Sequence, residues 1–197
     1  MAAARESLLE AASAALARRP WPTVRMVEVA AAAGVSRQTL YNEFGGKDGL
    51  ARALVRRAAD GYLAGVERAL AVGGGDWERL TAVAEWTVSA AQDDALVRAL
   101  LTGCWSARLP APPRDPSPVP AQRRPESPLP SPPELVGLVR DHAVTALSGP
   151  GTGPTATVEL ARSCELVVRL ALSCAAAPPG EGGVAALIRP LEPRAAL

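Results

Sequence analysis

Residues 24–50 read VRMVEVAAAAGVSRQTLYNEFGGKDGL, and they predict two short helices joined by a tight turn. The apolar side of the first helix is formed by Val29, Ala30 and Ala33. Gly34 follows at a position where a helix end often needs a positive φ, which glycine adopts at little steric cost. The side chain of Val35 can fill the turn, so the pattern predicts that the first helix ends at Gly34.

The second helix has a natural start, because the hydroxyl of Ser36 can accept a hydrogen bond from a backbone N–H of the first turn. Its apolar side carries Leu40, Tyr41 and Phe44. Its other side carries Arg37, Gln38, Thr39 and Asn42, whose polar groups can bond to base edges and phosphates. This pattern predicts a helix-turn-helix, the unit that lays its second helix in the major groove. The alternative is an amphipathic helix pair that serves only as core.

Residues 30–50 resemble the DNA-binding signature of the TetR family of bacterial transcriptional regulators. The matching elements are Val29-Ala30, Ala33-Gly34-Val35-Ser36, Thr39-Leu40-Tyr41, Phe44, Lys47-Asp48 and Leu50. Two positions depart from the family pattern. Gln38 stands where the family often has Gly, which adds an amide that can read a base. Arg25 stands where Thr is frequent, so the cap of the first helix is expected to fall to Thr23.

The resemblance implies an all-α fold with two domains. A three-helix helix-turn-helix DNA-binding domain would occupy residues 1–48, and a helical effector-binding and dimerisation domain residues 49–197. The family pattern places DNA contacts at Arg25, Ser36, Arg37, Gln38, Thr39, Tyr41, Asn42 and Lys47. Arg37, Gln38, Thr39 and Asn42 would face the bases, whereas Tyr41 and Lys47 would hold phosphates. The dipole at the start of its helix would aid Lys47.

The implied function is that of a homodimeric transcriptional regulator, a repressor that an unidentified small molecule releases from a palindromic operator in double-stranded DNA. Two other functions remain open. One is a DNA-binding regulator with no inducer, including an activator. The other is a helical small-molecule-binding module with a vestigial DNA-binding unit. A gel shift against the promoter of its own gene separates these possibilities.

Composition favours the same fold class and locates the positive charge. The chain has 197 residues, enough for one or two domains, and it is rich in Ala, Leu and Arg but poor in aromatic residues, which favours helices. Its net charge is only +1. Residues 1–57, however, carry nine basic and five acidic side chains, and such a local excess suffices for DNA if it lies on one face. Lys47 is the only lysine.

Several classes of function lack support in the sequence. One histidine and three scattered cysteines, Cys104, Cys164 and Cys174, provide neither a metal-binding set nor a Cys/His catalytic pair. We therefore expect no enzyme activity, no cofactor and no metal. The N-terminus shows no secretory signal, and no run of about 18 apolar residues predicts a membrane span. An odd number of free thiols suits the cytoplasm, where we expect the protein to be located.

Helical periodicity continues along the chain except in one segment. The pattern predicts helices over residues 5–18, 47–72, 77–91, 93–105, 134–147, 155–177 and 181–191. The first of these would pack across the helix-turn-helix. Residues 108–133 hold eleven of the nineteen prolines, a density that argues against helix and sheet. We expect this segment to be extended or disordered and to pack little.

The C-terminal part supplies candidates for an effector pocket and for a dimer interface. Pocket candidates are Trp77, Trp86, Cys104, Trp105, His142 and Cys164, although plain core packing is the favoured explanation for any single one of them. The helix at residues 155–177 is apolar on more than one side and so needs a second partner. With the last helix it would form the four-helix interface that the family uses. The interface candidates are Leu166, Leu170, Leu187, Ile188 and Leu191.

Overall fold

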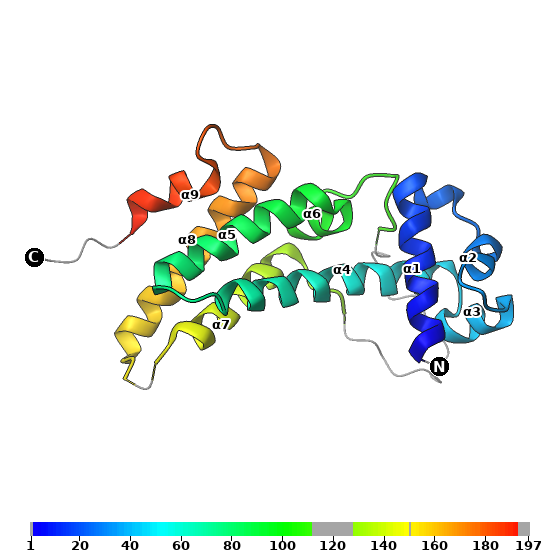
Figure 1. The fold of residues 1–197 in the computed structure, drawn as a ribbon, viewed down its shortest axis with the longest axis horizontal. Coiled ribbons are helices and arrows are strands. Elements are labelled where there is room, and N and C mark those ends of the chain that lie inside the picture. Colours follow the sequence, from blue (N-terminus) through cyan, green and yellow to red (C-terminus); the bar gives the residue numbers. More distant parts are fainter. Residues whose placement is uncertain (1, 112–127, 150, 193–197) are drawn as a thin grey trace, which may run out of the picture. The chain divides into compact units, whose positions relative to one another are not determined.

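The computed structural model describes residues 2–111, 128–149 and 151–192, and every regular element within these ranges is a helix (Figure 1). The prediction of an all-α fold is confirmed. In chain order the elements are α1 (Ala2–Arg18), η1 (Trp21–Thr23), α2 (Met26–Ala32), α3 (Arg37–Phe44), α4 (Lys47–Leu70), α5 (Asp76–Asp93), α6 (Ala95–Thr102), α7 (Pro132–Leu147), α8 (Pro154–Ala176), α9 (Gly183–Ile188) and η2 (Arg189–Leu191). No described helix is long and apolar enough to cross a membrane.

The chain divides into two compact units, and α4 belongs to both of them. The first unit holds the described residues of 1–58 and 104–129, and the second holds those of 59–103 and 130–197. The division therefore falls within α4, after its first twelve residues, and not at its start. The prediction of functional domains at 1–48 and 49–197 remains a prediction.

In the first unit, α1 packs against α2 and α3 and covers the back of the helix-turn-helix. Leu8 and Ala12 of α1 are fully buried, as is Leu40 of α3. Val29 and Ala30 of α2 are 1% exposed. Burying these apolar side chains contributes about 25 cal/mol per Å² of apolar surface, which fixes the short helices α2 and α3 against α1.

The turn between α2 and α3 forms as the sequence predicts, whereas the cap of α2 does not. Gly34 has a φ of 67°, and the amide of Val35 donates to the carbonyl oxygen of Ala30 over 3.0 Å. Arg25 occupies the N-cap position of α2 without a side-chain cap. The Thr23 hydroxyl donates instead to the carbonyl oxygen of Pro20. The predicted Thr23 cap is therefore wrong, because that hydroxyl closes η1.

The second unit is a bundle in which α8 packs against α5 and α7, and α9 packs against α5 and α8. Trp86 of α5 lies on α4 where Gly65 leaves room, because a Cβ at Gly65 would overlap the indole ring. Its Nε1 donates to the carbonyl oxygen of Tyr62 over 3.0 Å. The Tyr62 hydroxyl in turn shares a hydrogen bond with Thr87, and burial raises the pKa of Tyr62 to about 12.

The two ends of the proline-rich segment, residues 108–133, are more ordered than the composition predicts. Residues 112–127 lie outside the described part of the chain. Pro110, however, is buried, and the Arg108 carbonyl accepts a hydrogen bond from the Trp21 amide. Pro132 and Pro133 open α7, where a missing N–H costs little. The expectation that 108–133 packs little is thus wrong for its first residues, and the exclusion of helix is wrong for its last two.

Candidate nucleic-acid interface

The exposed side of α3 carries the polar side chains that the sequence assigns to base reading. Arg37, Gln38 and Asn42 are exposed and Thr39 is half-buried, whereas Leu40 and Phe44 face the core. The Gln38 Nε2 donates to the Asn42 Oδ1 over 2.8 Å. Two amides and a guanidinium therefore share one surface of a rigidly packed helix, and these groups can bond to base edges.

The start of α3 is fixed by Ser36. Its Oγ accepts a hydrogen bond from the Thr39 amide at 3.0 Å, which confirms the predicted N-cap. The hydroxyls of Ser36 and Thr39 also lie 2.9 Å apart. Tyr41 is 38% exposed, so the expectation that it belongs to the apolar side of α3 is wrong. Its exposure is compatible with the phosphate contact expected of it, and Arg25 is likewise exposed.

Lys47, expected to hold a phosphate, makes contacts within the protein. Its Nζ donates to the carbonyl oxygens of Pro22 and Val24 over 2.9 and 2.8 Å, and it lies 5.4 Å from the centroid of the Trp21 ring. Burial and the nearby Arg19 lower the pKa of Lys47, and Asp48 opposes this effect. An ammonium has three N–H donors, so one remains for a phosphate.

A pocket of about 580 Å³ lies in the second unit, at the C-terminal ends of α4 and α7. Its lining residues are Glu67, Leu70, Ala71, Arg79, His142, Thr145 and Ala146. His142 Nδ1 lies 3.4 Å from Glu67 Oε1. Arg79 donates to the carbonyl oxygens of Leu70 and Ala146, which lie in the last turns of α4 and α7. A lining that combines apolar side chains with three ionisable groups suits a small amphiphilic molecule.

Of the six predicted pocket residues, only His142 lines this pocket. Trp86 packs on Gly65, with the guanidinium of Arg68 5.8 Å from its ring centroid. Trp77 is half-buried, and its buried Nε1 has no hydrogen-bond partner among the residues that the structure describes. Cys164 is fully buried, and this burial raises its pKa to about 11. Cys104 and Trp105 belong to the first unit. Only His142 of the six therefore lines the described pocket, and an effector site at the other five remains a prediction.

The predicted interface residues separate into exposed and buried ones. Leu166 of α8 is 46% exposed, Leu187 of α9 is 48% exposed, and Leu191 is also exposed. Leu170 is half-buried. Ile188 is fully buried in the core of its own chain and cannot contact a partner, so its assignment to the interface is corrected. α9 is only six residues long, and neighbouring residues on so short a helix face different sides.

Comparison with known proteins agrees with this geometry. Residues 8–54 match the bacterial regulatory proteins of the tetR family. The HTH-type transcriptional regulator AlkX of Mycobacterium tuberculosis is 38% identical over 100 residues, which are 50% of this chain and 47% of that protein. Residues 8–54 of this chain are thus similar to the DNA-binding region of the TetR family. It spans about half the length of the curated relative that it matches.

Solved structures of TetR-family proteins share the fold over nearly the whole chain. The TetR family repressor AlkX from Dietzia sp. strain DQ12-45-1b has a TM-score of 0.51 and 19% identity, covering 95% of this chain and 92% of that one. A tetR-family transcriptional regulator from Streptomyces coelicolor has a TM-score of 0.56 and 22% identity, covering 97% and 78%. At these identities the likeness concerns the fold.

Sequence reasoning did not identify the residues that hold the start of the helix-turn-helix in place. One of these residues is Trp21, which lies between Pro20 and Pro22. The structure buries it beneath Lys47 and uses its amide to hold Arg108. Arg19 and Glu28 form an ion pair that joins the end of α1 to α2. The signal available in the sequence was an aromatic residue between two prolines, directly before the motif.

Proposed function

We propose that this chain binds a palindromic operator in double-stranded DNA as a homodimer and acts as a repressor that a small molecule releases. The observation that carries the proposal is the capped helix α3, which exposes Arg37, Gln38 and Asn42 while its other side is buried. Such a helix can enter the major groove with its first turns. Tyr41 and the third N–H of Lys47 would contact phosphates beside it.

The exposed leucines support the homodimer. Leu166 on α8 and Leu187 on α9 are nearly half-exposed, and Val158 lies eight residues before Leu166 on α8, so it shares the same side of the helix. Covering these faces with a second copy would approach the ~1,600 Å² of a stable interface. A two-fold axis would then place two α3 helices on half-sites about one helical turn apart.

The pocket at Glu67, Arg79 and His142 supports release by a small molecule. Its wall includes the last turn of α4, the helix that also begins at the helix-turn-helix with Lys47. The Dietzia AlkX repressor is described as implicated in the biodegradation of n-alkanes. We therefore propose n-alkanes and their oxidised derivatives as the first effectors to test.

The deciding experiment is selection of duplexes from a random pool by the full-length protein, followed by gel shifts with the selected DNA and with the promoter of its own gene. We expect a two-fold symmetric sequence that binds one dimer. Addition of the candidate effectors should then weaken the complex. If no sequence is enriched, the DNA-binding proposal is wrong and a small-molecule-binding module with a vestigial helix-turn-helix is favoured. Enrichment without any effector response would favour a regulator with no inducer.

A further inference from the structure

The short turn η1 holds together three segments that are distant in sequence. It lies between α1 and α2, and its Trp21 is only 7% exposed. Lys47 reaches it from the start of α4, and Arg108 reaches it from the connection that follows α6. All these residues belong to the first unit. The turn η1 therefore joins these three segments, and it directly precedes the helix-turn-helix in the sequence.

The contact from α4 fixes the entry into α2. Lys47 Nζ bonds to the carbonyl oxygens of Pro22 and Val24, and Val24 directly precedes the N-cap of α2. The Val24 amide donates back to the Trp21 carbonyl oxygen over 3.0 Å. Any displacement of the first residue of α4 must therefore break these bonds or move the start of α2 with it.

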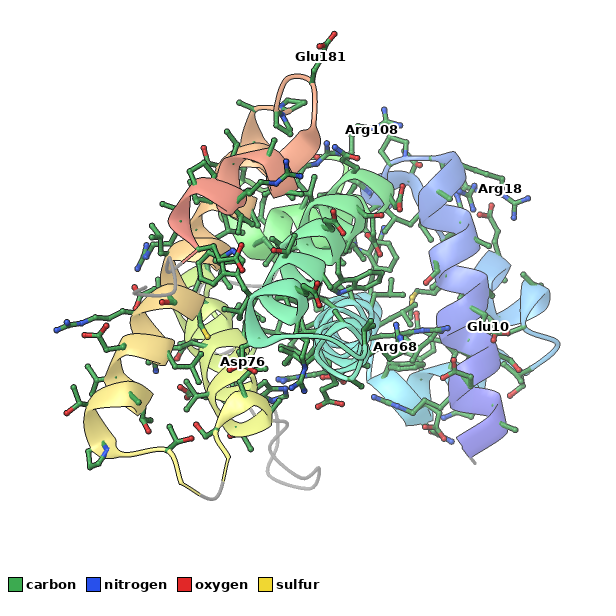
Figure 2. The ribbon with its side chains drawn as sticks, turned by 60° about the vertical axis from the view of Figure 1, so that its left-hand side comes forward. Glu10, Arg18, Arg68, Asp76, Arg108 and Glu181 are labelled. Carbon is green, nitrogen blue, oxygen red and sulfur yellow. The ribbon has the colours of Figure 1, made fainter. Side chains whose placement is uncertain are left out.

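The contact from the other connection involves residues 106–111, which we name the docking segment. The amide of Trp21 donates to the carbonyl oxygen of Arg108 over 2.8 Å. Within the segment, the amide of Leu109 donates to Ser106 and that of Ala111 to Leu109, and Pro110 is buried. Figure 1 shows this connection beside the end of α1, and Figure 2 labels Arg108. Its packing makes the docking segment part of the DNA-binding unit.

A second attachment holds the far side of the same connection. Arg56, on the part of α4 that belongs to the first unit, donates through Nη2 to the carbonyl oxygen of Pro128 over 2.8 Å. The connection between α6 and α7 is thus bonded to the first unit at Arg108 and again at Pro128. Both bonds use backbone carbonyl groups, so they depend on the path of the chain and not on particular side chains of the connection.

We propose that the docking segment positions the helix-turn-helix for DNA, acting through η1 as a second route beside α4. Few residues separate the end of α6 from Ser106. A shift of α6 would therefore displace Arg108 and, through the hydrogen bond between them, Trp21. Because the Val24 amide bonds to the Trp21 carbonyl oxygen, the start of α2 would move as well. The expected effect of the docking segment on DNA binding rests on the proposed function. Its effect on α2 can be measured without DNA.

The test compares Trp21→Pro with Trp21→Ala. Pro20 has φ −60° and ψ 141°, the conformation favoured before a proline, and Trp21 opens a helical turn where proline is tolerated. Both variants lose the indole, so they differ chiefly in the N–H that bonds to Arg108. We expect faster amide exchange over residues 24–33 in Trp21→Pro than in Trp21→Ala, with exchange in α8 alike in the two. Equal exchange over residues 24–33 would overturn the proposal.

DNA affinity gives the second readout, with the duplex that the wild-type protein selects as the probe. The loss of one backbone hydrogen bond predicts binding about two- to tenfold weaker for Trp21→Pro than for Trp21→Ala. Equal affinities would overturn the positioning role. If the wild-type protein selects no duplex, the proposed function fails, and the exchange comparison still decides the inference.

A second pair keeps the indole in case both Trp21 variants fail to fold. Pro110→Asp places a charge in the buried part of the docking segment, and Ala111→Asp places the same charge at its exposed neighbour. We expect faster exchange over residues 24–33 and weaker binding of the selected duplex only for Pro110→Asp. The same result for both variants would show that the docking of this segment does not position the helix-turn-helix.

Discussion

The side-chain amide of Gln38 donates to the Oδ1 of Asn42 over 2.8 Å, one turn further along α3. Both residues are exposed on the side of α3 that faces away from α1 and the core. The bond holds the Gln38 amide in one orientation before any DNA arrives. This bond leaves the carbonyl oxygen and the second N–H of the Gln38 amide for bidentate contact with a base.

Replacing Gln38 with Ala should relax the preference at one base position by ~1–3 kcal/mol, because a bidentate contact is lost. Asn42→Ala should weaken discrimination at that position and its neighbour, since it also frees the Gln38 amide to rotate. Competition among duplexes that differ at single positions measures both effects. Glu10→Ala, an exposed change on α1, serves as the control. An unaltered base preference in Gln38→Ala would remove this side chain from the groove.

Replacing Lys47 with Ala should weaken binding to all sequences alike and reduce the slope of log K against log salt by about one unit. It should also lower the free energy of unfolding by about 1–3 kcal/mol, because the carbonyl groups of Pro22 and Val24 lose a charged donor. Lys47→Arg keeps the charge and should keep the salt slope. Salt titrations and denaturant melts separate the two roles. A lower stability with an unchanged slope would assign Lys47 to the internal contacts alone.

Replacing Leu166 with Glu should convert the dimer to monomers and abolish operator binding, because a charge would replace a nearly half-exposed leucine in the proposed interface. Val72→Glu is the matched control: Val72 is 57% exposed but lies outside α8 and α9. Sedimentation at micromolar concentration reports the mass of each variant. A wild-type monomer that binds one operator tightly would rule out both the dimer and the palindrome.

Stability should fall in alkaline solution because two buried groups must keep their protons. Burial raises the pKa of Cys164 from 9.0 to about 11 and that of Tyr62 from 10.0 to about 12. The unfolded chain therefore releases these protons at lower pH than the folded chain does. The contribution of these two groups to the free energy of unfolding should be constant below about pH 9 and decline above it, through both folded pKa values.

The matched variants assign this decline to its sources. Tyr62→Phe removes the titrating hydroxyl, while the Thr87 hydroxyl still donates to the Val83 carbonyl oxygen. Cys164→Ala removes the thiol. Each variant should show a shallower decline than the wild-type protein in denaturant melts across the alkaline range. A decline of the same steepness in both would attribute it to other groups.

The local parts of the fold were predictable because their causes lie within a few residues. Gly34 adopts a positive φ because it has no side chain, and Ser36 caps α3 through a bond to Thr39, three positions away. Composition misled for Pro132, since proline is excluded from helix interiors but accepted in the first turn. The carbonyl groups that hold Lys47 lie more than twenty residues away, and the indole that requires Gly65 lies on another helix. Such contacts leave no periodic signal in one sequence.

Lys47 has a chemical consequence beyond DNA binding, because it is the only lysine among 197 residues. Reagents and enzymes that acylate lysine side chains have a single target in this chain, and it is the residue that joins α4 to the turn before α2. Acylation would neutralise the ammonium and displace it from the carbonyl oxygens of Pro22 and Val24. The rate at which Lys47 is labelled, measured on the peptide that contains it, therefore reports how often its Nζ leaves these two carbonyl oxygens in the unaltered protein.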